Sequence, residues 1–357
     1  KKKTNKLDAQ KYVTSLYSAL AELALLNSSK PLNNLVNEQT PGGLNWQGVN
    51  ELKKLGYYRL LEKSLNKKII VTTLGTGTPI LNPKRASQSI LVEAAGHRLL
   101  FDTGRNIATR LVQAKVKPSS VEQVFFTHFH SDHTVGFADF WLSSWIPAGG
   151  ARSSPLNVSG PSGTLNLIEG HRIAFGDDIK IRAKDQGLPK SGVEINVKEF
   201  DECGIVFDQD GIVVTSFEVD HGEAIKPNWG YKIEYSGQKV VISGDSKNDN
   251  RVSQIAKGAD LLFHSLGTAR KEIQEYDDVA AILQHHTTPS EAANIFTLSK
   301  PKLAVLVHMV LLGKPNFPPM SAEEVLRAIQ EIYNGPITIA EDLMRFEIGE
   351  KVNVVPY

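Results

Sequence analysis

The segment Thr127–His133 holds three histidines and one aspartate within six residues, in the order Thr-His-Phe-His-Ser-Asp-His. It follows an apolar run that is typical of a buried strand. Successive side chains of a strand point to opposite faces, so His128 and His130 can bind one ion together. Where the chain then turns, Asp132 and His133 can reach a second ion. Imidazole and carboxylate ligands without thiolate suit zinc, and less selectively iron or manganese.

Three further candidate ligands each follow an apolar run elsewhere in the chain: His221, Asp245 and His308. Taken singly, each has an ordinary interpretation, either a hydrogen-bonded histidine at the end of a strand or an aspartate that forms a turn. Taken with the first motif, they predict that several strand ends meet at one edge of a sheet. Their side chains would then complete two coordination shells there.

These motifs, in this order, resemble the metallo-β-lactamase superfamily over nearly all of residues 69–348. The resemblance implies an α/β fold, a four-layer αβ/βα sandwich with its metals on one edge. It also implies how seven side chains divide between two metals: one held by His128, His130 and His221, the other by Asp132, His133 and His308, and both bridged by Asp245. The predicted cofactors are two divalent metal ions, with zinc as the expected element.

Within that superfamily the sequence is most similar to the ribonuclease Z/arylsulfatase-like branch. The likeness is carried by short motifs outside the ligand set, namely Leu74–Pro79, Pro83–Arg85, Phe101–Gly104, Ser159–Thr164, Trp229–Tyr231 and His286–Thr288. His286 matches the histidine of that branch's His-Ser/Thr motif and is the predicted proton donor to the leaving group. His285 is the alternative donor. A plainer interpretation makes both an exposed pair at the start of a helix.

Such a site predicts a hydrolase. Two cations would hold a water between them as hydroxide, and would polarise the carbonyl, phosphoryl or sulfuryl centre that it attacks. Asp132 or Asp245 could accept a proton from this water. Asp102, in Phe-Asp-Thr-Gly, is expected to fix a turn and to orient a ligand histidine. Trp141 and Trp145 are expected to pack in the core, or alternatively to form a hydrophobic wall of the substrate pocket.

The elements that position these residues are predicted in two parts. Residues 1–68 form a basic, mainly helical extension, for which a signal peptide is the competing interpretation. Residues 69–357 form the catalytic domain, in which strand-like runs dominate and helical patterns punctuate them. The predicted strands are Lys68–Leu74, Ser89–Glu93, His97–Phe101, Val121–Thr127, Gly211–Val219, Tyr231–Tyr235, Val240–Ser243, Asp260–His264 and Leu303–His308. The predicted helices are Asn106–Ala114, Thr134–Ser144, Thr288–Leu298 and Ala322–Tyr333.

The composition is that of a globular protein, with 41% hydrophobic and 22% charged residues and a formal net charge of +1. A single cysteine, Cys203, excludes an intramolecular disulfide framework and a multi-cysteine metal site. No apolar run approaches the roughly 20 residues of a membrane span. Residues 1–68 carry 12 basic and 5 acidic side chains, which leaves 28 basic and 34 acidic, a net charge of −6, for the rest.

Four features favour a small substrate over RNA. The body is acidic, unlike a dedicated nucleic-acid binder. Ser265 stands where ribonuclease Z typically has an acidic residue, and no basic glycine-rich insertion is evident between His133 and His221. The segment around Trp141 and Trp145 is also similar to small-ester hydrolases of the branch.

The predicted function is therefore a dinuclear zinc-dependent hydrolase of a small ester, of the aryl sulfate, phosphoester, phosphodiester or lactone type. Two alternatives stay open: a ribonuclease Z-like endonuclease that processes tRNA 3′ ends, and a metal-binding scaffold without catalysis. The expected partner is a small molecule, nucleic acid is disfavoured, and a homodimer is left open. A periplasmic or secreted location is favoured over the cytoplasm, because the chain starts without Met and with lysines.

Overall fold

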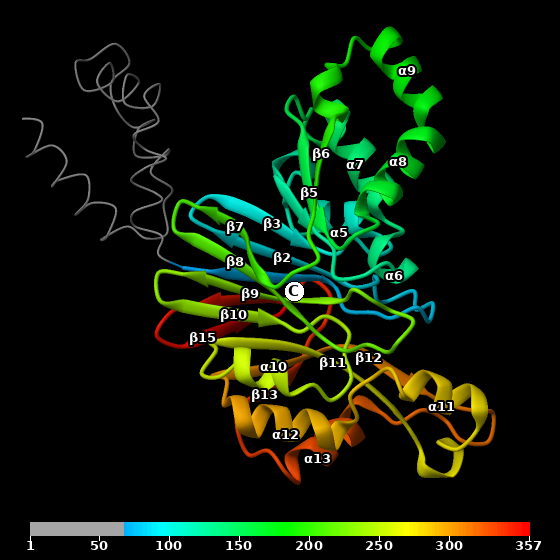
Figure 1. The fold of residues 1–357 in the computed structure, drawn as a ribbon, viewed down its shortest axis with the longest axis vertical. Coiled ribbons are helices and arrows are strands. Elements are labelled where there is room, and N and C mark those ends of the chain that lie inside the picture. Colours follow the sequence, from blue (N-terminus) through cyan, green and yellow to red (C-terminus); the bar gives the residue numbers. More distant parts are fainter. Residues whose placement is uncertain (1–67) are drawn as a thin grey trace, which may run out of the picture. The chain divides into compact units, whose positions relative to one another are not determined.

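Short apolar runs that begin at Ile69 pair into two β-sheets, which pack face to face with helices outside them (Figure 1). The computed structural model describes residues 68–357. The extension predicted over residues 1–68 lies outside the described residues, apart from Lys68. None of the helices in the described part of the chain combines the length and the apolar character needed to cross a bilayer.

The first sheet is antiparallel at one end and parallel at the other. Its strands, in spatial order, are β15 (Val352–Val355), β14 (Arg345–Ile348), β1 (Ile70–Gly75), β2 (Ser89–Ala94), β3 (His97–Phe101), β4 (Gln123–Phe125), β5 (Leu156–Gly160) and β6 (Ile195–Glu199). The strands from β3 to β6 run parallel. The carboxyl ends of β4 and its parallel neighbours therefore meet at one edge of this sheet.

The second sheet has the same mixed character. Its order is β13 (Ile337–Ile339), β12 (Leu303–Leu312), β11 (Leu261–Ala269), β10 (Gln238–Ile242), β9 (Trp229–Tyr235), β8 (Ile212–Glu218) and β7 (Gly204–Gln209). The strands from β10 to β13 are parallel, and those from β7 to β10 are antiparallel.

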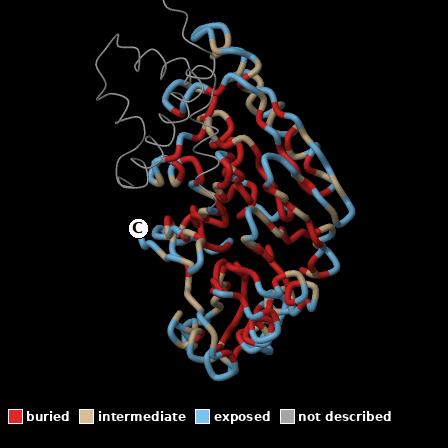
Figure 2. The backbone as a smooth tube through the Cα atoms, turned by 90° about the vertical axis from the view of Figure 1, so that its left-hand side faces the viewer, coloured by how far each residue is buried: buried red, intermediate tan, exposed pale blue. Residues whose placement is uncertain are grey.

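Alternation along the strands divides the apolar side chains into three layers. Val92 and Phe101 point between the sheets, whereas Leu91 and Leu100 point outwards. The outward layer of the first sheet packs under α5 (Ile107–Gln113), α7 (Phe137–Trp145) and α8 (Thr164–Ala174). That of the second packs under α10 (Asn250–Ile255), α12 (Pro289–Ser299) and α13 (Ala322–Gln330). Figure 2 shows the buried stretches between exposed loops. The predicted four-layer sandwich is confirmed.

The remaining helices are α6 (Ser131–Thr134), α9 (Gly176–Asp185) and α11 (Asp277–Leu283).

Hydrogen bonds from the second sheet fix the end of β4. The backbone N–H of Trp229 donates to the carbonyl of Thr127 at 3.0 Å, and the Tyr231 hydroxyl donates to that of Phe126 at 2.5 Å. Both sheets therefore share one edge at the segment that carries the histidines.

One strand departs from its predicted end. β12 runs on to Leu312, so His308 lies within it and does not end it. Val307 pairs with Ser265 and Met309 with Leu266, which leaves His308 as an extra residue with φ of 45°. This is a β-bulge, and such a residue is aimed differently from its neighbours. The bulge turns the His308 side chain towards the shared edge.

Candidate metal centre

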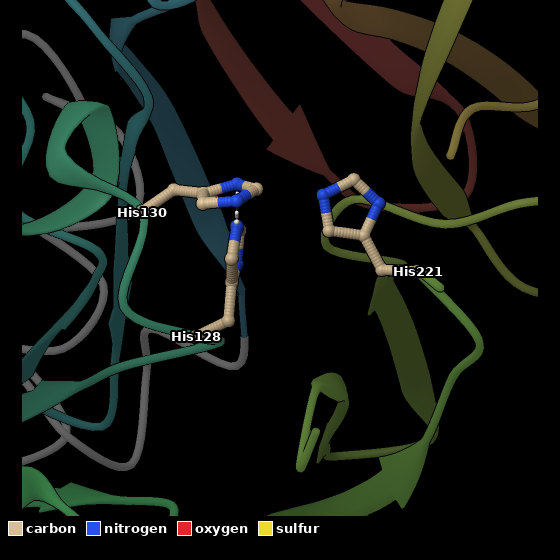
Figure 3. Close-up of side chains that lie close together, drawn as sticks. All are labelled: His128, His130 and His221. Atoms are coloured by element: carbon tan, nitrogen blue, oxygen red, sulfur yellow. Dashed lines mark hydrogen bonds between the residues drawn. The ribbon is translucent and has the colours of Figure 1, made fainter. Parts of the chain in front are cut away.

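Three histidines from both sheets form the first cluster of ligand atoms (Figure 3). His128 and His130 follow β4, and His221 follows β8. Nε2 of His128 lies 2.9 Å from Nδ1 of His130. One nitrogen from each of the three rings lies within 4.8 Å of the others. His128 and His221 are buried and His130 is exposed, so one side of this cluster is open to solvent.

A second cluster lies beside the first and contains Asp132, His133 and His308. The Asp132 carboxylate is 2.9 Å from Nε2 of His308 and 3.7 Å from Nε2 of His133. Asp132 and His133 belong to the short helix α6, which turns them back towards the sheet edge. All three residues are at most 1% exposed.

Asp245 faces both clusters. Its carboxylate oxygens lie 3.4 Å from Nε2 of His133, 3.3 Å from Nδ1 of His308 and 3.9 Å from Nε2 of His221. The turn that brings it there needs a glycine, because Gly244 has φ of 65° and a Cβ would come within 2.8 Å of a backbone oxygen. The structure thus brings together all seven side chains that the resemblance assigned to metals.

These side chains fit divalent metal ions. Among residues 68–357, buried nitrogens of His133, His221 and His308 lack a hydrogen-bond partner, which is rare for buried polar atoms. The other ring nitrogens of His133 and His221 donate to Asp102 and to the carbonyl of His285, both at 2.7 Å. Those bonds fix the tautomers and leave each Nε2 lone pair aimed into the centre.

The protonation states of the rings also suit ligands. Burial lowers the pKa of His128 well below its usual range and that of His221 to about 4, so both are neutral near pH 7. Burial alone would lower the pKa of His133, but the charges of Asp102, Asp245 and Asp132 raise it well above its usual range. A cation among these carboxylates would take the place of that proton.

Asp102 lies directly behind His133, as expected for a residue that orients a ligand. Its Oδ1 accepts the backbone N–H of Thr127 at 2.9 Å, and its Oδ2 accepts the Thr127 hydroxyl at 2.9 Å. Sequence reasoning missed Thr127, whose hydroxyl also lies 3.0 Å from Nδ1 of His128. Its position directly before the first histidine of the motif could have indicated from the sequence that Thr127 contributes to the site.

We expect Asp102→Asn to weaken metal binding by about 10- to 100-fold without unfolding the chain. The amide can still accept one hydrogen bond, but its NH₂ group would face Nδ1–H of His133 and release that ring. Metal titration against a competing chelator measures the change. The matched control is Asp208→Asn, an exposed carboxylate on β7; equal affinities of the two variants would contradict the prediction.

His286 lies at the centre, whereas His285 contributes its backbone carbonyl to His221. Side-chain atoms of His286, Asp245 and His308 lie within 4.8 Å of one another. The loop that carries His286 is fixed by Thr287, whose N–H and hydroxyl both donate to the Ser246 carbonyl, at 2.9 and 2.8 Å. Burial lowers the pKa of His286 to about 4.

The plainer interpretation of this pair, an exposed cap of the following helix, does not describe the structure. Thr288 caps α12, in a capping box with Glu291. His285 and His286 are both half-buried.

Two other predicted features lie away from the centre. Trp141 and Trp145 are 1% and 0% exposed, and their indoles donate to the carbonyls of Val193 and Pro189. They pack in the core and do not line a pocket at the metals. Ser265 is fully buried, and its hydroxyl donates to the Gly244 carbonyl at 3.1 Å. It therefore supports the turn before Asp245.

Comparisons with known proteins agree with this geometry. A family model described as a beta-lactamase superfamily domain matches residues 97–309. Ribonuclease Z of Mycobacterium bovis (strain BCG / Pasteur 1173P2) is 33% identical over 282 residues, covering 78% of this chain and 98% of that protein. Ribonuclease Z of Mycobacterium marinum (strain ATCC BAA-535 / M) is 32% identical over 287 residues, covering 78% and 99%.

Two solved structures share the fold. The metallo-beta-lactamase fold protein YhfI from Bacillus subtilis has a TM-score of 0.61 at 16% identity, covering 79% of this chain and all of that one. Human tRNase Z, short form, has a TM-score of 0.57 at 22% identity, covering 77% and 98%. At such identities these likenesses support the fold alone.

Proposed function

The chain belongs to the beta-lactamase superfamily and, within it, to the ribonuclease Z family, and from that premise we propose that it is an endonuclease that processes the 3′ ends of tRNA precursors. The observation that supports this proposal most strongly is the cluster of seven candidate ligand side chains with His286 beside them. The chain also covers 98% of a relative named ribonuclease Z. The protein is a metal-dependent hydrolase that acts on ester bonds.

The prediction of a small aryl sulfate, phosphoester or lactone substrate is wrong, and so is the prediction that nucleic acid is disfavoured. Curated relatives that match over nearly their whole length are named ribonuclease Z. The net charge of −6 was a poor guide to the substrate, because it sums charges over residues 69–357. A phosphate is bound by a few nearby side chains and by metals. The inferences from Ser265 and from the two tryptophans were wrong because these side chains are buried in the protein and do not face a substrate.

The superfamily fold implies divalent metal ions. We propose two, both zinc: His128, His130 and His221 would hold one, Asp132, His133 and His308 would hold the other, and Asp245 would contribute to both. When bound, the metals supply Lewis acidity, which activates a water and stabilises negative charge on the phosphoryl group.

The chain's own residues then move protons and hold the groups in place. The carboxylate of Asp245, with Asp132 as the alternative, accepts the proton of the attacking water. The ring of His286 lies on the same side of the site as His308. Burial holds its pKa at about 4 in the free chain, and the charge of a bound phosphodiester raises that pKa, so that the ring takes up a proton and supplies it to the leaving sugar oxygen. Asp102 keeps His133 in place throughout. Residues 69–357 carry all of these groups, which supports the proposal that they form the catalytic domain.

A labelled tRNA precursor with a 3′ extension tests the function directly. Incubated with the full chain and zinc, it is expected to be cut once, with release of the trailer. The same tRNA without an extension is the matched control and is expected to stay intact. Hydrolysis of bis(p-nitrophenyl) phosphate with no cut in the precursor would contradict the proposed substrate and leave the hydrolase assignment standing.

We expect His286→Ala to lower RNA cleavage by about 10²-fold, and hydrolysis of bis(p-nitrophenyl) phosphate by less than about ten-fold. A sugar oxygen leaves poorly unless it receives a proton, whereas nitrophenolate leaves without one. Steady-state kinetics on both substrates measure the difference. His285→Ala is the matched control, since it keeps the backbone carbonyl that accepts from His221. Equal losses on both substrates would assign His286 to binding or structure.

A further inference from the structure

An exposed aromatic ring lies beside the metal centre and has no part in the chemistry above. Phe129 stands between His128 and His130 and is 38% exposed, whereas Phe125 and Phe126 just before it are buried. Neighbouring side chains in an extended segment point to opposite sides. Phe129 therefore faces away from the two imidazoles, towards the loop that precedes α8.

That loop holds one edge of the ring. Gly163 has φ of 105°, and a Cβ at this position would come within 3.0 Å of Cε2 of Phe129. The ring thus lies against bare backbone. The loop is itself fixed, because the Glu199 carboxylate accepts the N–H groups of Gly163 and Leu165, both at 2.8 Å. Phe129 is held in place at one edge while part of its surface stays open to solvent.

The arginines around the centre are engaged within the protein. Arg85 donates to the Thr76 hydroxyl at 2.6 Å and to the Ala340 carbonyl at 2.9 Å. Arg105 donates to two backbone carbonyls of the neighbouring loop, at 3.0 and 3.2 Å. Contacts that do not depend on charge therefore become more important for holding the RNA next to the bond that is cut.

On the premise of the proposed RNA substrate, we propose that Phe129 is a stacking platform for one nucleobase that flanks the scissile phosphate. Every nucleobase has a π-face, so an aromatic ring accepts any of the four bases without hydrogen bonds. One sugar separates a base from its phosphates, and Phe129 directly adjoins a proposed ligand on each side, His128 and His130. The ring thereby positions the strand at the metals whatever its sequence.

A double-mutant cycle between the ring and the base tests this inference. Phe129→Ala and the wild type are compared on the 3′-extended precursor, and on two precursors that lack the base on the 5′ or the 3′ side of the cut. We expect Phe129→Ala to lower kcat/KM by roughly ten-fold on the intact precursor. On one of the two abasic precursors we expect a loss of less than about two-fold.

Two further variants separate stacking from apolar surface. Phe129→Trp is expected to keep activity within about three-fold, and Phe129→Leu to behave like Phe129→Ala. Leu165→Ala removes an exposed apolar side chain without a π-face, two residues after Gly163 on α8, and is expected to cost less than about two-fold. Metal content per chain is measured for each variant, to show that the ligands are intact.

The outcomes against the inference are distinct. Equal losses of Phe129→Ala on the intact and both abasic precursors, or no loss on any, would overturn the stacking role. A loss in Leu165→Ala as large as in Phe129→Ala would overturn it in favour of a general apolar surface. A wild-type chain that cuts none of the precursors would overturn the proposed function, and this inference with it.

Discussion

Asp245→Asn is expected to lower kcat/KM for RNA cleavage by about 10³-fold or more. The Asp245 carboxylate faces both ligand clusters, at 3.4 Å from His133 and 3.3 Å from His308. Burial opposes its ionisation, yet the charges of His308 and His133 hold its pKa well below its usual range. It is therefore an anion, and an amide of the same shape would leave two cations without that charge.

Cleavage of the 3′-extended precursor and metal content per chain measure this effect together. Asp139→Asn is the matched control, because Asp139 is an exposed carboxylate on α7, near the ligand motif in sequence. We expect the control to keep full activity and full metal content. Activity of Asp245→Asn within ten-fold of the wild type would contradict the role of Asp245 between the metals.

Removal of the metals by a chelator is expected to abolish cleavage and to lower the melting temperature. A metal present at 100 times its Kd stabilises the folded state by about 2.7 kcal/mol per site. In a domain of this size that corresponds to a shift on the order of 5 °C per site. Without cations the buried carboxylates of Asp132 and Asp245 face neighbouring imidazoles and repel each other.

Thermal melts with and without chelator, followed by return of zinc, manganese or iron, measure both changes. Zinc is expected to restore activity and stability most fully. Asp245→Asn is expected to show a smaller shift on chelation, because it binds less metal at the start. Complete loss of activity with an unchanged melting temperature would place the essential metal away from the buried centre.

The sequence predicted the elements whose pattern is set within a single segment. Strong apolar runs located most central strands, such as β1, β8 and β10, and the ligand motif at the end of β4 is local by nature. Elements with weak patterns were missed. α9 buries none of its side chains and so shows no helical stripe, and β15 alternates between half-buried and exposed positions.

Other features could not be predicted because they depend on a partner segment. The bulge at His308 exists only relative to the register of β11, which no single run reveals. The support of Ser265 for the Gly244 turn depends on contacts between strands in the same way. The prediction of the substrate class was wrong for a related reason, since a net charge does not say where on the surface the charges lie. The names of the curated relatives correct that prediction, and residue counts could not.

The bulge in β12 also has an evolutionary consequence. Because His308 is an extra residue relative to β11, loss of one residue at this point would restore regular pairing between the two strands. A deletion of that kind repairs the sheet and removes the ligand. Selection for folding alone would therefore not favour keeping this residue, whereas selection for metal binding would. A lineage that discards the histidine while keeping the strand would become an inactive paralogue in one step.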